Sequence, residues 1–302
     1  MPQKDTSLSW EVDGQQIIIS NPDKVYWPEE GYTKLDCLHY YQEMAAIMLP
    51  HLQQRPTTLH YFPHGINDFS FYKRDFSKVT GYPLHTVTYE EVSQDKSIQV
   101  LLIDKLADML WLTSKGAIEY HLWSATVPRL NQPDRAIFDL DISTKTTFDT
   151  LLTAATYLHE LLQELGIRGL VKTSGGSGLH VVVPIKPIYT YEEVRDWVKQ
   201  LGNQLAHKHP DLITTKTLSG KTHQGDKITV DYLQNVISRN TAAPYTLRGK
   251  PGAPVSTPLS WEEVAKGGFT PTDFNIKTIP QRVQQQGDLF APVFSDAQTL
   301  PI

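Results

Sequence analysis

The segment 136–143 alternates apolar and acidic residues with the two-residue period of a β-strand. Phe138 and Leu140 therefore lie on one face of the expected strand, because successive side chains of a strand point to opposite sides. Asp139 and Asp141 lie on the other face. Two neighbouring carboxylates repel each other unless a cation lies between them, and divalent metals bind oxygen ligands. The segment predicts either a metal-binding strand or, as for most Asp-x-Asp triplets, a half-buried strand with a solvated acidic face.

Two later segments favour the metal-binding interpretation. A third acid, Asp231, lies in the β-rich segment 228–233, and the glycine-rich segment 173–180 precedes it with Ser174 and His180. Two acids on one strand, then a glycine-rich turn, then a third acid on a later strand is an arrangement that suits nucleotidyl transfer. In that reaction two metals about 4 Å apart activate an attacking hydroxyl and stabilise the leaving oxygen. Backbone amides in a glycine turn can bind phosphate oxygens. A plain glycine-rich hairpin has the same pattern and remains an alternative.

Hydrophobic periodicity and capping residues predict the main elements. We expect helices over 33–50, 101–112, 147–166 and 191–207, and strands over 16–20, 57–62, 118–123, 170–173 and 179–185. Thr33 is the expected cap of the first helix, with Asp36 as its capping-box partner, and Thr147 is the expected cap of the third. The proline-rich segment 244–255 excludes a regular helix and favours an extended path from which Arg248 and Lys250 project.

The length and the cysteine content limit the possible classes of protein. The 302 residues are enough for one large domain or two closely packed ones. The single cysteine, Cys37, excludes an internal disulfide and suits a reducing compartment. No signal peptide opens the sequence, and no apolar run reaches membrane-spanning length. We therefore expect a cytoplasmic protein without a membrane partner.

The formal net charge of −5 argues against a protein that coats nucleic acid as a whole. Basic residues nevertheless gather in one stretch, as Lys208, Lys216, Lys221, Lys227, Arg239, Arg248 and Lys250. In the segment 69–74, Phe71 and Tyr72 stand beside Lys73 and Arg74. Aromatic rings next to cations can stack on unpaired bases while the cations contact phosphates. A core strand with a charged end is equally compatible with this segment.

In their order and spacing, several motifs resemble the polymerase domain of bacterial ligase D, a member of the archaeo-eukaryotic primase superfamily. The motifs are Asn21-Pro-Asp-Lys24, Phe71-Tyr72, His121-Leu-Trp123, Phe138-Asp139-Leu-Asp141, Ser174-Gly-Gly-Ser-Gly-Leu-His180, Val230-Asp231 and Arg248-Gly-Lys-Pro-Gly-Ala-Pro. The resemblance extends over about 16–290. Each motif alone is weakly specific, but the combination is highly specific.

The resemblance implies a primase-polymerase fold of the mixed α+β class. A central, mostly antiparallel sheet would carry the metal site, flanked by helices and by a second, smaller α/β part. Residues 1–302 would then form a single catalytic domain. No Lys-x-Asp-Gly motif of an ATP-dependent ligase is present in the sequence, so we expect neither a ligase nor a phosphoesterase domain in this chain.

The implied activity is template-directed addition of nucleotides, preferably ribonucleotides, to 3′-hydroxyl ends of DNA during non-homologous end joining. The implied partners are DNA with gaps or 3′ overhangs and a 5′-phosphate, the Ku protein and a DNA ligase, and the expected location is the nucleoid of a prokaryote. Three alternatives remain: a stand-alone primase-polymerase for gap filling or priming without Ku, a metal-dependent nuclease, and a DNA-end-binding scaffold without catalysis.

The resemblance also implies roles for individual residues. Two Mn²⁺ or Mg²⁺ ions would be held by Asp139, Asp141 and Asp231, and an incoming ribo- or deoxyribonucleoside triphosphate by Ser174, His180, Arg248, Lys250 and Gln234. A 5′-phosphate would be bound by Asn21, Lys24 and Lys34, and the template and primer by Phe71, Tyr72 and His121. Two positions depart from the family pattern. Family members often have Lys at the position of Ser177 and Arg at the position of Lys250. Both changes are expected to weaken triphosphate binding.

Overall fold

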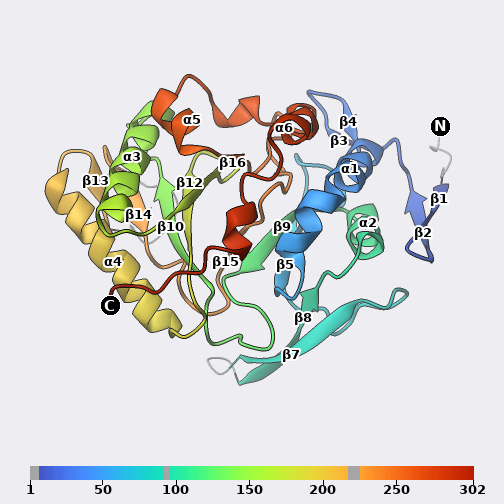
Figure 1. Ribbon diagram of the computed structural model, residues 1–302. Coiled ribbons are helices and arrows are strands. Elements are labelled where there is room, and N and C mark those ends of the chain that lie inside the picture. The colour runs from blue at the N-terminus through green and yellow to red at the C-terminus, as the bar shows by residue number, and fades with distance from the viewer. Residues whose placement is uncertain (1–6, 92–94, 217–224) are drawn as a thin grey trace.

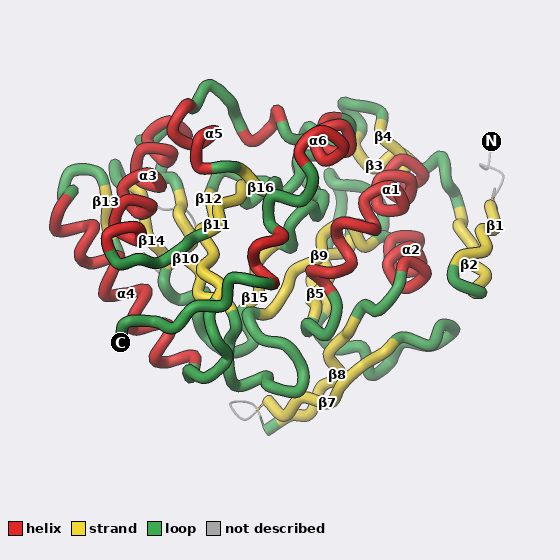
Figure 2. The backbone as a smooth tube through the Cα atoms, in the orientation of Figure 1, coloured by secondary structure: helices red, strands yellow, loops and turns green. Residues whose placement is uncertain are grey.

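The computed structural model describes residues 7–91, 95–216 and 225–302. Within these residues the chain forms two six-stranded sheets that lie next to each other, each covered by helices (Figures 1 and 2). Lys221 of the basic stretch lies outside the described residues. None of the helices described here combines the length and the apolar character that crossing a membrane requires.

The first sheet contains the strand predicted from the Asp-x-Asp segment, and we call it the acid-bearing sheet. In spatial order its strands are β13 (Ile213–Thr214), β14 (Ile228–Asp231), β10 (Arg135–Asp141), β12 (Leu179–Pro184), β11 (Leu170–Thr173) and β16 (Pro258–Leu259). Only the β13–β14 pair among them is parallel. Helices α3 (Phe148–Glu164) and α4 (Tyr191–Lys208) pack against this sheet (Figure 1). Phe138 meets Trp197 of α4 with ring centroids 5.6 Å apart, so the apolar face of β10 points toward the helices.

The second sheet contains the strands that precede the Asp-x-Asp segment, together with one later strand. Its order is β15 (Asn240–Ala242), β9 (Ala117–Trp123), β5 (Thr57–Tyr61), β8 (Lys96–Leu102) and β7 (His85–Glu91), with β6 (Phe71–Lys73) also paired to β5. Helices α1 (Lys34–Leu52) and α2 (Leu106–Ser114) pack on this side of the molecule (Figure 1). Tyr41 of α1 contacts Tyr120 of β9 edge to face, with ring centroids 5.0 Å apart.

The helix predicted over 101–112 is wrong in its first part. Leu101 and Leu102 are the last residues of β8, and α2 begins only at Leu106. The start is set by Asp108, whose carboxylate accepts the backbone N–H groups of Asp104 and Lys105 at 3.2 and 3.3 Å. An acid in the first turn thus satisfies donors that lie just before the helix.

Short elements complete the fold. They are β1 (Ser7–Val12), β2 (Gln15–Ser20), β3 (Val25–Trp27), β4 (Tyr32–Thr33), α5 (Trp261–Lys266), α6 (Thr278–Gln286) and two 3₁₀ turns, η2 (Pro271–Asp273) and η3 (Ala291–Phe294). The predicted caps are confirmed. Thr33 Oγ1 accepts the N–H of Asp36 at 3.2 Å, and Asp36 Oδ2 accepts the N–H of Thr33 at 2.7 Å. Thr147 caps α3 through the N–H of Thr150 at 3.2 Å.

A continuous hydrophobic core connects the two sheets. Its buried side chains include Leu59 and Tyr120 from the second sheet, and Phe138 and Val181 from the acid-bearing sheet. The predicted mixed α+β class is therefore confirmed, and the sheet that carries the acids is antiparallel at all but one of its pairings. The core holds both sheets in place around the residues predicted for the site.

Candidate active site

Four charged or titratable side chains form a row across the acid-bearing sheet. Asp139 of β10 is the register partner of Asp231 on β14 and of His180 on β12. His180 is in turn the partner of Lys172 on β11. Residues directly opposite each other in antiparallel strands share a face of the sheet. The sheet therefore presents Asp231, Asp139, His180 and Lys172 on one face, and we call these four residues the charged row.

The acidic end of the charged row fits a divalent metal. Asp139 is only 8% exposed, and its burial, together with the negative charges of Asp141 and Asp231, raises its pKa well above the ordinary value. Asp139 also forms a side-chain hydrogen bond with Gln234. A cation relieves the repulsion within such a group, and carboxylate oxygens suit Mg²⁺ and Mn²⁺. No three His, Cys, Asp or Glu side chains of the described residues are already arranged as a metal site.

The basic end of the charged row contains Lys172, to which the sequence analysis gave no role. Its side chain is buried, and Nζ donates to Ser256 Oγ at 2.6 Å and lies 2.9 Å from His180 Nδ1. Burial lowers the pKa of Lys172 well below its ordinary value. When Lys172 carries its charge, its ammonium group has no lone pair and can only donate to Nδ1, which places the ring proton of His180 on Nε2. His180 Nε2 is 3.4 Å from Asp139 Oδ1. Burial lowers the pKa of His180 well below its ordinary value, and the charges of Lys172 and Arg248 lower it further.

The glycine turn, residues 174–178, lies between strand β10 and the segment 244–255, which carries Arg248 and Lys250 and which we call the basic loop. Ser174 Oγ accepts the N–H groups of Gly176 and Gly178, each at 3.1 Å. A Cβ atom on Gly178 would lie 2.7 Å from the carbonyl oxygen of Leu140, and one on Gly176 would lie 2.5 Å from Lys250 Nζ. Glycine is therefore required at Gly178, where the contact is with backbone, whereas at Gly176 the flexible end of Lys250 could move aside. The turn brings backbone amides, Ser174 and Lys250 close to one another, as phosphate binding requires.

The proline-rich segment 244–255 is not extended as predicted. It turns back on itself, so that Leu247 pairs with Val255 and the N–H of Arg248 donates to Pro254 O at 2.8 Å. Gly252 makes the reversal possible because its φ of +85° is in the left-handed region. The Arg248 guanidinium donates to the carbonyl oxygen of Ser174, which places it beside the glycine turn.

A cavity of about 390 Å³ adjoins the glycine turn. Lys250 lines it together with Ser177, Phe148 and neighbouring residues. Burial lowers the pKa of Lys250, and the nearby charge of Arg248 lowers it further. Ser177 and Lys250, the two departures from the family pattern, thus line the same cavity.

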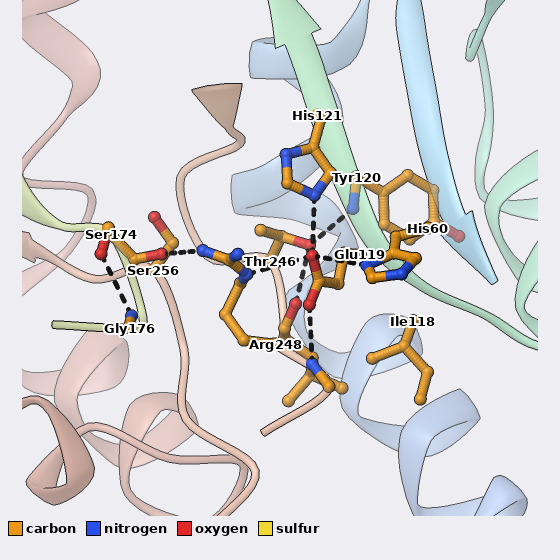
Figure 3. A network of polar contacts seen from close by, with 12 residues as sticks. His60, Ile118, Glu119, Tyr120, His121, Ser174, Gly176, Thr246, Arg248 and Ser256 are labelled. Carbon is orange, nitrogen blue, oxygen red and sulfur yellow. Dashed lines mark hydrogen bonds and ion pairs between the residues drawn. The ribbon is translucent and has the colours of Figure 1, made fainter. Parts of the chain in front are cut away.

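A second missed residue, Glu119 of β9, faces the basic loop from the second sheet (Figure 3). Glu119 and His121 both lie within the predicted strand 118–123, and the family resemblance implies a role only for His121. The structure shows that the two side chains contact each other, since His121 Nε2 lies 2.8 Å from Glu119 Oε2. A Glu and a His two residues apart in an otherwise apolar strand were the only signal in the sequence.

The predicted template-binding aromatics lie on β6, a strand of the second sheet that pairs with β5. Phe71 is 38% exposed and Tyr72 is 56% exposed. Tyr72 stacks on His60 with ring centroids 3.9 Å apart and meets His121 edge to face at 5.5 Å. Phe71 stacks on Tyr61 at 5.2 Å. The structure therefore brings Tyr72 and His121 together and leaves aromatic surface accessible for a base.

The residues predicted to bind a 5′-phosphate form a separate basic group near the start of α1. Lys24 Nζ donates to Pro63 O at 2.8 Å and lies 2.9 Å from His64 Nδ1. The N–H of Lys24 donates to Asn21 O at 3.1 Å, which closes the turn that connects the two residues. The N–H of Lys34 donates to Lys24 O at 2.9 Å, so the two lysines are adjacent.

Lys34 is the most perturbed cation of this group. It is buried, and its Nζ donates to Ser20 O at 2.6 Å and to Ser114 O at 3.2 Å. Burial lowers the pKa of Lys34 to about 8, with contributions from the charges of Lys24 and Lys115. Lys115 is a further cation of the group that the sequence analysis missed.

Facing acids on an antiparallel sheet, beside a glycine turn and a basic loop, define a protein of the nucleotidyltransferase class. A family model described as LigD, primase-polymerase domain, matches residues 33–290. The chain therefore belongs to this family, whose members are nucleotidyltransferases of the primase-polymerase type.

Three known proteins place the chain within the family. The bifunctional non-homologous end joining protein LigD of Bacillus subtilis is 29% identical over 288 residues, which cover 95% of this chain and 46% of that protein. The multifunctional protein of the same name from Pseudomonas aeruginosa is 30% identical, covering 89% of this chain and 31% of that protein. The polymerase domain of Mycobacterium tuberculosis ligase D, solved in complex with DNA, superposes with a TM-score of 0.84 at 26% identity, covering 93% of this chain and 98% of that domain. The chain thus spans less than half the length of these two curated relatives.

Proposed function

We propose that this protein adds nucleotides, preferably ribonucleotides, to 3′-hydroxyl ends of DNA at gaps or breaks, under the direction of a template and as part of non-homologous end joining. The observation that carries the proposal is the charged row, in which Asp139 lies directly opposite both Asp231 and His180. The names of the relatives and the DNA bound to the mycobacterial domain support the biological context.

In this proposal Asp139, Asp141 and Asp231 hold two Mn²⁺ or Mg²⁺ ions. When bound, such ions lower the pKa of a primer 3′-hydroxyl and neutralise charge on the departing pyrophosphate. The burial of Asp139 and the negative charges of Asp141 and Asp231 close to it support this assignment, because a cation offsets their mutual repulsion.

The side chains around the acids bind the incoming triphosphate. When Lys172 is charged, His180 directs a protonated Nε2 toward the acidic end of the row, where it can donate to a phosphate oxygen. Arg248 and Lys250 provide positive charge on the other side of the glycine turn. We assign Ser174 and Gln234 to the same subsite, since Ser174 organises the turn and Gln234 contacts Asp139.

The remaining assignments concern the DNA and the protein partners. Phe71 and Tyr72 stack on the template, and His121 lies at the primer end, beside Tyr72. We further propose that residues 1–302 act as a single catalytic domain, since one hydrophobic core joins both sheets. Sealing of the joined strand then requires a DNA ligase, on another protein or on another part of a longer polypeptide, and Ku brings the DNA ends.

Primer extension tests this function directly. The substrate is a gapped duplex with a 5′-phosphate on the downstream strand, supplied with ribo- or deoxyribonucleoside triphosphates and with Mn²⁺ or Mg²⁺. We expect templated addition that is stronger with ribonucleotides and with the 5′-phosphate. Synthesis on single strands without a primer would identify a stand-alone primase-polymerase, and release of mononucleotides without triphosphates would identify a nuclease. Tight DNA binding without any reaction would identify a scaffold.

Lys24→Ala is expected to weaken binding to gapped DNA about tenfold when the 5′-phosphate is present, because a charged hydrogen bond contributes roughly 1.5 kcal/mol or more. Binding to the same DNA with a 5′-hydroxyl should stay unchanged. Fluorescence anisotropy with both substrates measures the difference, and Lys266→Ala, at the exposed end of α5, is the matched control. An equal loss on both substrates would exclude a phosphate-specific role for Lys24.

The lowered pKa of Lys34 predicts a pH-dependent preference for the 5′-phosphate. Lys34 is protonated below its pKa of about 8 and loses its charge above it. A phosphate monoester is already a dianion at pH 7, so the affinity advantage of 5′-phosphorylated DNA should fall between about pH 7 and pH 9. Affinity for 5′-hydroxyl DNA should not follow this change. Lys34→Met should remove the fall of this affinity advantage between about pH 7 and pH 9. If the variant keeps the pH profile of the wild type, Lys34 does not bind the 5′-phosphate.

A further inference from the structure

Glu119 is a buried carboxylate with cationic or N–H partners on several sides (Figure 3). Its Oε2 accepts from His121 Nε2 at 2.8 Å and lies 3.3 Å from His60 Nδ1. The same oxygen forms an ion pair with Arg248 Nε at 3.2 Å. Oε1 accepts the backbone N–H of Gly249 at 2.8 Å. The two oxygens therefore have distinct partners.

The partners of Glu119 keep it ionised. Burial alone would raise the pKa of this carboxyl, since it is only 2% exposed. Hydrogen bonds from His121 and His60 and the charge of Arg248 outweigh burial and hold its pKa below the ordinary value. An ionised carboxylate can only accept hydrogen bonds, so His121 must present a protonated Nε2 to Glu119 at 2.8 Å.

These contacts join two parts of the proposed site. On one side, Arg248 donates to the carbonyl oxygen of Ser174 in the glycine turn. On the other side, His60 stacks on Tyr72, and Tyr72 meets His121 edge to face. Figure 3 shows Glu119 between Arg248 on one side and His60 and His121 on the other. Glu119 thus connects the residues proposed for the triphosphate with those proposed for the template and primer.

We propose that Glu119 is a positioning residue for the incoming nucleotide, which acts by fixing the orientation of Arg248. This inference rests on the proposed function and deepens it. A guanidinium is planar and has five N–H donors. The charge of Glu119 beside Nε and the hydrogen bond from Nη1 to Ser174 O hold the guanidinium in one orientation, so its remaining N–H groups are presented to a phosphate in a fixed geometry. A side chain fixed before binding loses less entropy when the triphosphate arrives.

Glu119→Gln separates the two oxygens chemically. The amide carbonyl can still accept the N–H of Gly249, whereas the amide NH₂ cannot accept from Arg248 or His121. In single-nucleotide gap filling we expect the KM for the nucleoside triphosphate to rise about ten- to hundredfold, as for loss of a charged hydrogen bond. The value of kcat should change by less than about threefold, because the reacting groups remain in place.

A double-mutant cycle distinguishes positioning from mere support of the fold. In an Arg248→Ala background, Glu119→Gln should cause no further rise in KM, because the group that Glu119 orients is already absent. Glu263→Gln provides the matched control. Glu263 also forms an ion pair with an arginine, since its Oε2 lies 2.6 Å from Arg282 Nη2, but this pair lies outside the proposed site. This control should leave KM unchanged.

Two results would overturn the proposal: equal rises of KM in both backgrounds, or a fall of kcat at unchanged KM. If Glu119→Gln does not fold, Glu119→Asp is used in the same cycle, because it keeps the buried charge but withdraws it from Arg248. Thermal melting of each variant reports on folding. A wild-type protein that extends no primer would refute the proposed function itself, which is a different outcome from any variant result.

Discussion

Replacement of Asp139 by alanine is expected to abolish primer extension while DNA binding stays largely intact. Asp139 is the central acid of the charged row, opposite Asp231 on one side and His180 on the other. Loss of the proposed metal ligand removes several kcal/mol of transition-state stabilisation, which corresponds to a rate decrease of at least about a thousandfold. Gel-based extension assays and anisotropy on the same gapped duplex measure the two properties.

Folding of the Asp139 variant is not at risk, because the substitution removes one of three mutually repelling carboxylates. Asp139→Asn is the isosteric companion and should be equally inactive. Asp196→Asn on α4 removes an exposed acid that pairs only with its neighbour Arg195 among the described ion pairs, so it should retain full activity. Substantial extension by Asp139→Ala would count heavily against the metal assignment.

Phe138→Ala is expected to lower the free energy of unfolding by about 3–5 kcal/mol, the usual cost of removing a buried aromatic ring. Phe138 is fully buried and packs edge to face on Trp197 of α4. Its removal would leave a cavity between β10 and the helix that covers it. Urea denaturation monitored by tryptophan fluorescence measures the loss.

Phe138→Leu is the matched control and should lose about 1.5 kcal/mol or less, since most of the buried volume remains. A loss below about 1 kcal/mol for the alanine variant would mean that the contact between β10 and α4 contributes little to the fold. Phe138 and Asp139 are neighbours on opposite faces of β10. We therefore expect Phe138→Ala to lower stability and Asp139→Ala to abolish activity.

Features encoded by local patterns could be predicted from the sequence. The two-residue period alone placed Phe138 and Asp139 on opposite faces of one strand. The caps at Thr33 and Thr147 were also predictable, because a cap and its partner lie within three residues. The order and spacing of the motifs indicated the family resemblance, and the resemblance implied the fold class.

Features that depend on distant contacts could not be predicted in this way. Lys172 donates to Ser256, which is 84 residues away in sequence, and Glu119 accepts from Gly249, which is 130 residues away. Neither lysine nor glutamate in a strand indicates its partner. The reversal of 244–255 was missed because the prolines suggested an extended path, whereas Gly252 allows the turn.

The charged row has a consequence for how this protein can vary in length. Each of β14, β10, β12 and β11 contributes one of its members. Inserting or deleting one residue within any of these strands would turn the following side chains to the opposite face and bury a charge against the helices. Length changes are therefore confined to segments outside these strands. The spacing of the strands should therefore persist among descendants of this sequence even where most surface residues have been replaced.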